Sequence, residues 1–484
     1  MNMPFEGLNI NVIAVLPEML LTALAMVILL LDMIFRKGNK DVLAYVSIMG
    51  LLIILPVSLL TVEPSPVFGG MVISDSFSSF FDIIFILTAI FTILISMDYL
   101  KKVNKQRGEY YYIILFATLG MMVMVSSNDL INLYVGLELM ALSFYILVAF
   151  RIDNNRSVEG ALKYFVLSAL SSGILLYGIS FVYGSAGTTN LLEIARQVGK
   201  SAGAFLFIAI GLITVGFSFK VALFPFHIWA PDTYEGAPTP ITALLSVGSK
   251  TAAFAVFLRV FIVAFPALQP DWSRLLWLLS ACTMLFGSVV AISQRNIIRM
   301  LAYSSIAHAG IIIMGLLVYN AIGVAGVMYY LLVYTFMNMG AFAIVTMFIR
   351  DDKKGENISD YKGLASRHPL LSFLMALFLL SLAGVPPTGG FVAKFFILAS
   401  AINAHYYGLA VIGILATAIS LFFYAKVIFY MYMREPEGIT ESPHRTGFDY
   451  KVVLAITAAG TVAIGIYPAP FMDMAIKAIK PFLP

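Results

Sequence analysis

The sequence consists largely of apolar segments that are long enough to cross a lipid bilayer as helices. A transmembrane helix needs about 20 such residues. Windows of that length give fourteen predicted spans, which begin near residues 11, 42, 77, 110, 129, 158, 203, 239, 273, 297, 322, 370, 406 and 451. Because a backbone in lipid must satisfy its own hydrogen bonds, we predict an all-α integral membrane fold. The composition, 61% hydrophobic and 12% charged, excludes an ordinary soluble domain.

Lysine and arginine are unevenly distributed among the connections between these spans. The connections after odd-numbered spans carry 19 of the 30 Lys and Arg residues, whereas the opposite side carries 5. Cytoplasmic loops are enriched in these residues, so both termini are predicted to lie outside the cytoplasm. The connection between spans 7 and 8 has no positive charge and is the weak point of this alternation. No connection is long enough for a soluble domain, so residues 1–484 are predicted to form a single polytopic membrane domain.

Composition and motifs exclude several classes of function. A net charge of +4 without a basic run does not suit nucleic-acid binding, so no nucleic-acid partner is expected. The only cysteine, Cys282, rules out an internal disulfide and a cysteine-ligated cluster. No histidine pair has metal-ligand spacing, and no glycine-rich nucleotide-binding motif is present. We therefore expect neither a metal nor a cofactor on this chain.

Four lysines and one glutamate lie inside predicted spans, namely Lys163, Lys220, Lys250, Lys394 and Glu138. A charge at the bilayer centre costs at least about 2.5 kcal/mol, and such residues by default mark ion paths or proton relays. Lysine suits a relay because it can lose its charge when buried, whereas arginine stays charged. The pattern therefore predicts a proton path through these residues.

Static roles are the alternatives for these charges. Glu138 lies about ten residues into its span, where a carboxylate must be neutralised or paired, so a permanent ion pair between helices would also account for it. Lys163 has Glu159 one helical turn before it, which favours a local pair. Arg259 and Lys426 lie nearer to span ends, where their side chains could reach the membrane surface.

Two histidines could add proton-transfer steps. His308 lies within a span next to serines and Tyr303, which suits a hydrogen-bonded file of side chains and water. His227 lies in the sequence PFHIWAPDTYEGAPTP, just after a predicted helix break. Both are predicted as accessory relay residues, with a purely structural hydrogen bond as the alternative for each.

The buried cations also indicate an internal repeat. Lys220 and Lys394 are 174 residues apart, and Lys250 and Lys426 are 176 apart. LFPF follows Lys220 and GVPPTGG precedes Lys394, and helix-breaking residues at membrane depth are tolerated where they are buried or line a polar cavity. Because the two units lie five spans apart, an odd number, the second is predicted to be inverted relative to the first, as in transporters. A coincidence among six intramembrane cations is the alternative.

The repeats have predicted boundaries. The first covers about residues 110–267 and the second about 273–433, with five helices each, and spans in 11–100 and 451–471 flank them. Spans 7 and 12 are predicted to be broken, near Pro225 and at Pro386 and Pro387.

Several stretches closely resemble the antiporter-like subunits of respiratory complex I, the proton-translocating NADH:quinone oxidoreductase. They are GLELMALSFYILVAF, VEGALKYFVLSALSSGILLYGISFVYGS, KVALFPFHIWAPDTYEGAPTP, RMLAYSSIAHAG and SLAGVPPTGGFVAKF. The resemblance covers almost the whole chain and is to the N type, since PDTYEGAPTP and the LKY stretch at Lys163 are N-like and Lys394 stands where the M type has glutamate. Only thirteen residues follow Phe471, where the L type carries a long lateral helix.

The resemblance implies a role for each buried residue. Glu138 and Lys220 would form the ion pair of one half-channel, Lys250 would be the central lysine, and Lys394 would end the other half. Lys163 and His308 would be accessory members of the same axis. The implied activity is proton translocation, coupled to NADH oxidation and quinone reduction in other subunits of the enzyme.

The resemblance also implies the surroundings of the chain. It implies no flavin, iron–sulfur cluster or quinone on this chain; the parent complex would use NADH and quinone. The expected partners are M-type, K-type and J-type membrane-arm subunits, the lateral helix of the L-type subunit, and lipid. The expected location is a prokaryotic plasma membrane. A subunit of a secondary cation/proton antiporter shares this fold and also needs buried lysines, so it is the alternative function.

Overall fold

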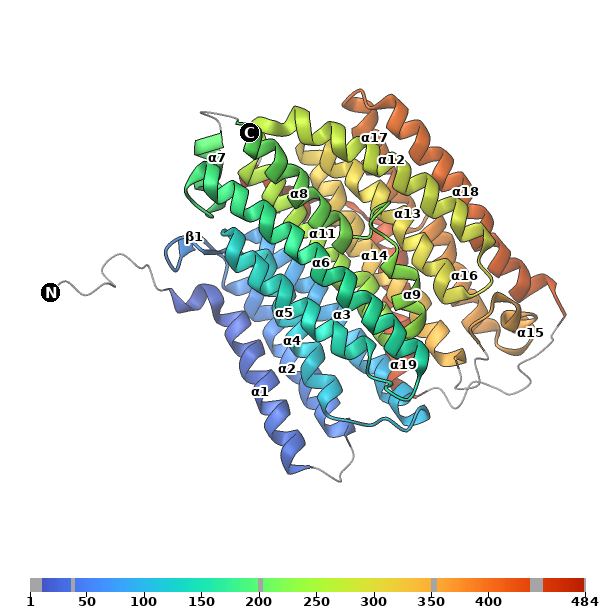
Figure 1. Ribbon diagram of the computed structural model, residues 1–484. Helices are drawn as coiled ribbons and strands as arrows, with labels where there is room; N and C mark the ends of the chain where they lie inside the picture. Colours follow the sequence, from blue (N-terminus) through green and yellow to red (C-terminus); the bar gives the residue numbers. More distant parts are fainter. Residues whose placement is uncertain (1–10, 36–39, 199–202, 350–354, 436–446, 483–484) are drawn as a thin grey trace.

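A computed structural model describes residues 11–35, 40–198, 203–349, 355–435 and 447–482. Figure 1 shows long helices lying side by side, with α1 (Leu16–Ile34) and α2 (Asp41–Leu60) at one edge and α18 (Tyr407–Met433) at another. The other long helices are α3 (Ser76–Lys102), α4 (Glu109–Ser126), α5 (Leu130–Val148), α6 (Asn155–Ala186), α12 (Gln269–Ser293), α13 (Ile297–Leu317), α14 (Ala321–Phe348) and α19 (Phe448–Ile466). The predicted all-α membrane fold is confirmed.

The number of spans depends on how broken helices are counted. Twelve helical segments of the described residues are long and apolar enough to cross a membrane. Three shorter apolar helices complete the bundle, and they are α8 (Ala204–Lys220), α16 (Pro369–Ala383) and α17 (Gly389–Asn403). The count of fourteen, which takes each broken helix as one span, stays a prediction.

Two helices are interrupted where the sequence predicts breaks. α8 ends before a loop that contains Pro225, and helix resumes only at α9 (Trp229–Gly236). α16 and α17 are separated by a turn that contains Pro386 and Pro387. Proline lacks the N–H that continues a helical hydrogen-bond ladder, so the helix stops at each site. Each break contains one cis X-Pro peptide bond. The inverted relation of the two halves stays a prediction.

The helix after the first break has an irregularity that the sequence does not predict. It comprises α10 (Thr239–Leu244), a π-helical turn (Leu245–Ser249), α11 (Lys250–Arg259) and a second π-helical turn (Val260–Ala264). Its apolar segment is buried throughout. π-Helical turns often occur at functional sites. Here they bracket α11, which carries Lys250 at its first position and Arg259 at its last.

Polar caps fix the starts of two helices that matter for the site. Asp129 caps α5 and Asn296 caps α13, and each side chain accepts hydrogen bonds from two backbone N–H groups. Such caps satisfy donors that have no partner within the first turn of a helix. They therefore set where each helix begins, and with it the positions of Glu138 and His308 along the bundle.

A β-hairpin and short helices lie outside the long helices. A short antiparallel hairpin, β1 (Glu63–Val67) and β2 (Val72–Ser74), follows α2. The side-chain amides of Asn128 and Asn190 both donate to the Gly70 carbonyl in its turn, which ties the hairpin to the neighbouring connections. Of two further short helices, α7 (Leu191–Val198) lies near the hairpin (Figure 1), and α20 (Ala469–Ile479) packs against α3 and α14.

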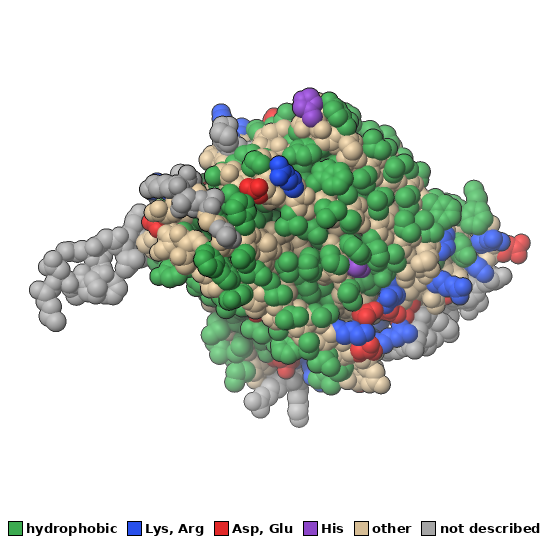
Figure 2. Space-filling view, turned by 45° about the horizontal axis from the view of Figure 1, so that its top comes forward, with side chains coloured by type: hydrophobic (Ala, Val, Ile, Leu, Met, Phe, Trp, Pro, Cys, Tyr) green, Lys and Arg blue, Asp and Glu red, His purple; other side chains and the backbone are tan. Residues whose placement is uncertain are grey.

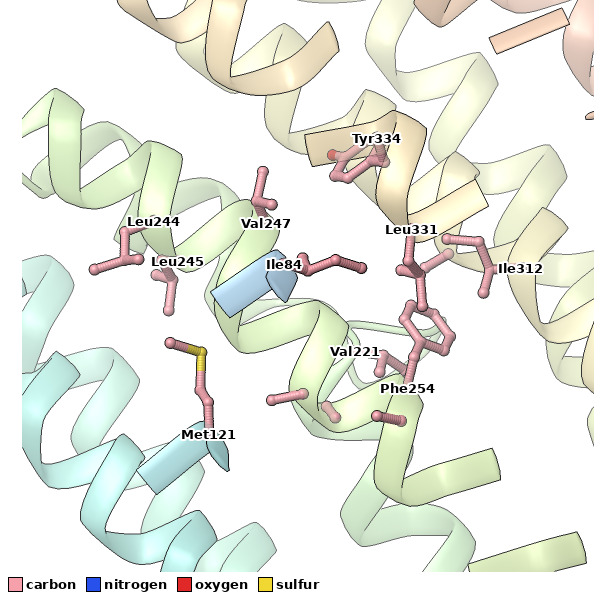
Figure 3. Packing of buried hydrophobic residues seen from close by; sticks show 14 of the residues in the cluster. Ile84, Met121, Val221, Leu244, Leu245, Val247, Phe254, Ile312, Leu331 and Tyr334 are labelled. Carbon is pink, nitrogen blue, oxygen red and sulfur yellow. The ribbon is translucent and has the colours of Figure 1, made fainter. Parts of the chain in front are cut away.

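Buried hydrophobic side chains from both halves of the chain form one continuous core. Residues of α3, α4, α11, α13 and α14 meet in it (Figure 3), among them Ile84, Met121, Phe254, Ile312 and Leu331. Protein cores are packed as densely as organic crystals, so polar side chains between these helices have few alternative positions.

Ion pairs join the connections that the charge distribution assigns to the cytoplasm. The pairs are Lys101–Asp41 (2.6 Å), Lys105–Asp153 (3.2 Å), Arg156–Glu235 (3.3 Å), Arg156–Glu356 (3.1 Å) and Arg299–Asp232 (2.8 Å). They link the connections after spans 1, 3, 5, 7, 9 and 11, so these six lie on one side of the bundle. We call this side the ion-paired face, and Figure 2 shows charged side chains gathered in one region beside a mostly hydrophobic surface.

The same pairs explain the connection that lacks positive charge. The connection between spans 7 and 8 contains Asp232 and Glu235. Their partners, Arg156 and Arg299, come from other connections. Arginines of other connections therefore supply the positive charge beside this connection. Several cations used in the charge count lie outside the described residues, namely Arg36, Lys37, Lys200, Arg350, Lys353, Lys354 and Arg445.

Candidate functional site: a buried row of polar side chains

Polar side chains lie buried among helices that belong to both halves of the chain. We use the name polar row for Lys220, Tyr234, Lys250, Ser305, His308, Tyr330, Tyr424 and Lys394. Its three lysines are 1%, 3% and 4% exposed. Burying an unpaired ammonium is costly, so the partners of these lysines decide what the row can do.

Lys220 is the last residue of α8 and donates a hydrogen bond to the Ser168 hydroxyl of α6 at 2.7 Å. Glu138 of α5 lies close enough for its charge to act on Lys220. Within the described residues, however, no ion pair joins the two, and Oε1 of Glu138 is buried without a hydrogen-bond partner. The direct ion pair that the resemblance implies is therefore not formed here, because the ammonium is bound to α6 and the carboxylate acts on it only through space.

Lys250 follows the first π-helical turn and donates to the Ser305 hydroxyl of α13 at 2.7 Å. Ser305 in turn donates to the carbonyl of Ala302, so its oxygen is free to accept from the lysine. Nζ of Lys250 also lies 5.8 Å from the centre of the Tyr234 ring, within the range of a cation–π contact. Within the described residues, the contacts of this lysine are thus to neutral groups.

His308 is held between two tyrosines. Its Nδ1 lies 2.5 Å from the Tyr330 hydroxyl, and its Nε2 lies 3.0 Å from the Tyr424 hydroxyl, which also contacts Ser304. A neutral imidazole has one donor and one acceptor nitrogen, so the two tyrosines take opposite roles. The predicted hydrogen-bonded file is present, but these two tyrosines form it rather than Tyr303.

Lys394 binds the end of the helix half that precedes it. Its Nζ donates to the backbone carbonyls of Leu382 at 2.8 Å and Ala383 at 3.0 Å. These carbonyls belong to the last turn of α16, where the break leaves them without helical partners. A cation is favoured there because the carboxyl end of a helix carries partial negative charge.

A small cavity separates His308 from Lys394. Both residues line it together with Ser288, Ser304 and Tyr424, and the space that a water molecule could occupy is about 10 Å³. The Ser288 hydroxyl is buried and has no hydrogen-bond partner within the described part of the chain. Polar cavities with unsatisfied groups are where ordered water binds in proteins. His308 and Lys394 therefore border one small cavity, with room for about one water molecule.

Two predicted accessory residues lie outside the polar row. The Lys163 side chain is 44% exposed and forms ion pairs with Glu159 at 2.7 Å and Asp232 at 2.8 Å, as the local-pair alternative requires. His227 lies in the loop of the first break, where its ring stacks on Phe224 and its buried Nδ1 has no hydrogen-bond partner within the described residues. Their roles in a relay stay predictions.

The two cations near span ends differ from each other. The Arg259 side chain is 1% exposed, and its Nη2 lies 2.8 and 2.9 Å from the two carboxylate oxygens of Asp75. The alternative in which Arg259 reaches the membrane surface is therefore wrong, because Asp75 at the start of α3 supplies a buried partner. Lys426 is half-buried and donates to the carbonyls of Ile292 and Gln294 at the end of α12.

Sequence reasoning missed the tyrosines of the site. Tyr234, Tyr330 and Tyr424 bring ring or hydroxyl contacts to Lys250 and His308. The available signal was that a tyrosine in an apolar span needs a partner for its hydroxyl. With 24 tyrosines in the chain, that signal does not single out these three.

The donor set of the row consists of amines, hydroxyls and one imidazole, which are groups that carry or relay protons. Among the residues that the structure describes, no group of three or more His, Cys, Asp or Glu is placed to hold a metal ion.

Comparison with protein families gives one match over most of the chain. The family model described as NADH:quinone oxidoreductase/Mrp antiporter, TM matches residues 127–420. This range contains Glu138 and the three buried lysines of the polar row.

Individual relatives match over nearly their full length. The chain is 43% identical to NADH-quinone oxidoreductase subunit N of Trichlorobacter lovleyi, over 98% of both chains. It is 42% identical to F(420)H(2) dehydrogenase subunit N of Methanosarcina mazei, over 97% of this chain and 98% of that one. A chain of respiratory complex I from Thermus thermophilus is 31% identical with a TM-score of 0.81, and the match covers 95% of this chain and 99% of that one. The two relatives are named for different electron donors, so similarity identifies the type of subunit and not the donor.

Proposed function

This chain belongs to the NADH:quinone oxidoreductase/Mrp antiporter family, and from that premise we propose that it carries protons across the membrane through its polar row. It is an antiporter-like, multi-pass membrane subunit of the subunit N type found in complex I. The enzyme activity belongs to the parent complex, in which we propose that other subunits oxidise NADH and reduce quinone. We propose no redox centre on this chain.

One observation carries the proposal. Three lysines that are at least 96% buried are held by neutral groups, which are the hydroxyls of Ser168 and Ser305 and the carbonyls at the end of α16. A lysine in such surroundings can give up a proton and regain it, which arginine cannot do. A lysine with a structural role alone would be expected to contact a carboxylate, as Lys163 does on the ion-paired face.

We propose separate roles for the residues of the polar row and for Glu138, whose charge acts on Lys220. Glu138 and Lys220 serve the first repeat, at about residues 110–267, whereas His308 and Lys394 serve the second, at about 273–433. Lys250 connects the two. Moving one charge against 100 mV costs about 2.3 kcal/mol. Two like charges about 6 Å apart repel by roughly 3 kcal/mol at an effective dielectric constant of about 20, so a neighbouring charge is sufficient to expel a proton.

We propose a location and partners consistent with this role. The chain would lie in a prokaryotic plasma membrane, with the ion-paired face in the cytoplasm and both termini on the opposite side. M-type, K-type and J-type subunits, the lateral helix of an L-type subunit and lipid would cover its hydrophobic sides. Because one relative is named for F(420)H(2), the electron donor should be assayed directly with both NADH and F(420)H(2).

Proton uptake by liposomes that contain the purified parent complex tests the proposal. Glu138→Gln and Lys220→Met are expected to leave assembly intact and to lower proton uptake per quinone reduced at least tenfold. Glu109→Gln, which changes an exposed glutamate at the start of α4, serves as the matched control and should pump normally. Wild-type uptake by the two variants in assembled complexes would refute the polar row as the path.

The same liposomes separate the proposal from the antiporter alternative. An antiporter subunit would move protons in response to an imposed Na⁺ gradient without any electron donor. The proposed subunit should move them only while quinone is being reduced.

A further inference from the structure

A second cluster of buried charges lies outside the polar row. It consists of Glu18 on α1, Asp75 and Asp82 at and after the start of α3, and Arg259 at the end of α11. We call it the acidic cluster. Asp75, Asp82 and Arg259 are 6%, 5% and 3% exposed. The far end of α3 carries Lys101 of the ion-paired face, so the cluster lies toward the opposite side of the bundle.

Arg259 is already engaged within this cluster. Its guanidinium binds both oxygens of Asp75, at 2.8 and 2.9 Å. The same group lies 4.9 Å from the centre of the Phe77 ring and 5.2 Å from that of Phe482. One carboxylate and two aromatic faces therefore surround the only cation of the cluster, and its charge is balanced by Asp75.

Asp82 and Glu18 form no ion pair within the described residues, and the side-chain partner of Glu18 is the neutral Ser126. Oδ1 of Asp82 and Oε2 of Glu18 are buried and form no hydrogen bond within the described residues. Asp82 follows Asp75 by seven residues, about two helical turns, so both lie on one face of α3. The charged groups that act on Asp82 are Glu18, Asp75 and Arg259.

The charges of the acidic cluster do not balance if every carboxyl group is ionised. Three carboxylates would face one guanidinium, leaving two buried negative charges, and the penalty for burying even one unpaired carboxylate is prohibitive. A hard metal ion takes about six or more oxygen ligands, and no set of acidic side chains among the described residues has the geometry to bind one. A proton needs only one carboxylate oxygen.

We propose that Glu18 and Asp82 hold at least one proton between them at neutral pH and so form a titratable site separate from the polar row. The charge of Glu18 acts on Asp82, and two buried carboxylates that interact in this way bind protons as a pair, because ionising both is strongly disfavoured. The site lies beside the end of α11, whose other end carries Lys250, nine residues or roughly 13 Å away along the helix. If this proton takes part in translocation, that role rests on the proposed function. The presence of the proton does not depend on it.

Infrared spectroscopy of the intact parent complex tests this directly. Spectra recorded at high and neutral pH are subtracted, so that carbonyl bands of protonated carboxyl groups appear. We expect Asp82→Asn and Glu18→Gln each to remove or shift one band that the wild type has, and Asp82→Glu to retain a band. Unchanged spectra in both Asp82→Asn and Glu18→Gln would overturn the proposal.

Thermal unfolding provides the second measurement, with a matched variant on the same helix. Asp82→Asn replaces a carboxyl group that is proposed to be neutral, so the Tm of the complex should stay unchanged or rise. Asp75→Asn removes the charge that balances Arg259, so the Tm should fall. An equal fall for both variants would mean that Asp82 is ionised and paired, which contradicts the proposal. If Asp75→Asn prevents assembly, the infrared comparison decides alone, with Asp473→Asn on the exposed face of α20 as a control that should leave the bands of Glu18 and Asp82 unchanged. Neither measurement depends on pumping.

Discussion

Two lysines of this chain bind helix ends in the same manner but in different surroundings. Lys394 donates to the last carbonyls of α16, is 4% exposed and borders the cavity beside His308. Lys426 donates to carbonyls at the end of α12 and is half-buried at the edge of the bundle. The local chemistry of the two ammonium groups is therefore alike, and only Lys394 belongs to the polar row.

This pair gives a prediction at the residue scale. Lys394→Arg keeps the donors to α16 but fixes the charge, so we expect normal assembly and proton uptake reduced at least tenfold, or about 1.4 kcal/mol in the barrier. Lys426→Arg makes the same change outside the row and should pump as the wild type does. The measurement is proton uptake per quinone reduced. Equal uptake by the two variants would show that Lys394 is a fixed charge and not a proton carrier.

Helix ends inside the bundle are the elements that create the site. The break between α16 and α17 exposes the carbonyls that bind Lys394, and the turn begins with Gly384 at φ +88°. A left-handed residue with a side chain costs roughly 1–2 kcal/mol, so glycine suits this position. Helix α6 ends in a similar way at Gly187, with φ +71°. A Cβ at Gly187 would meet no other atom within 4 Å.

The two glycines give a prediction at the element scale. A Cβ on Gly384 would lie 2.9 Å from Cδ of Lys394, whereas one on Gly187 would meet no atom within 4 Å. Both Gly→Ala variants should lose roughly 1–2 kcal/mol of stability from the backbone alone. Only Gly384→Ala should also lower proton uptake, because it displaces the lysine. Tm and uptake are measured together, and a pumping defect of equal size in Gly187→Ala would contradict this assignment.

For the whole molecule, the ion pairs establish which connections share a side. Six of the connections are linked by ion pairs on the ion-paired face. The acidic cluster lies toward the opposite side, where Phe482 contacts Arg259. The charge distribution of the sequence and the contacts of the fold thus give the same grouping of connections.

Cysteine labelling checks this arrangement across the membrane. Cys282 is the only cysteine, so in a Cys282→Ser background each introduced cysteine is the only one that can be labelled. Asn155→Cys, on the ion-paired face, should react with a membrane-impermeant maleimide only after cells are permeabilised. Asp473→Cys on α20 should react in intact cells. Both positions are exposed. Labelling of Asn155→Cys from outside would reverse the proposed orientation.

Much of the fold and part of the site follow from the sequence alone. The apolar segments predict membrane helices because lipid leaves a backbone few other choices. The prolines at residues 225, 386 and 387 predict the breaks because a missing N–H acts locally. The buried positions of Lys220, Lys250 and Lys394 follow from the apolar residues on either side of them. These are all properties of residues close together in the chain.

Only the tertiary structure decides which groups these charges meet. Lys220 binds Ser168 rather than Glu138, Lys250 binds Ser305 across 55 residues, and Arg259 binds Asp75 across 184. Each partner lies on another helix, and its identity depends on helix rotation, on the π-helical turns and on the packing of neighbouring side chains. A sequence pattern records which side of a helix is polar, but it does not record which helix lies against that side, so the contacts that tune each buried charge appear only when the helices are packed.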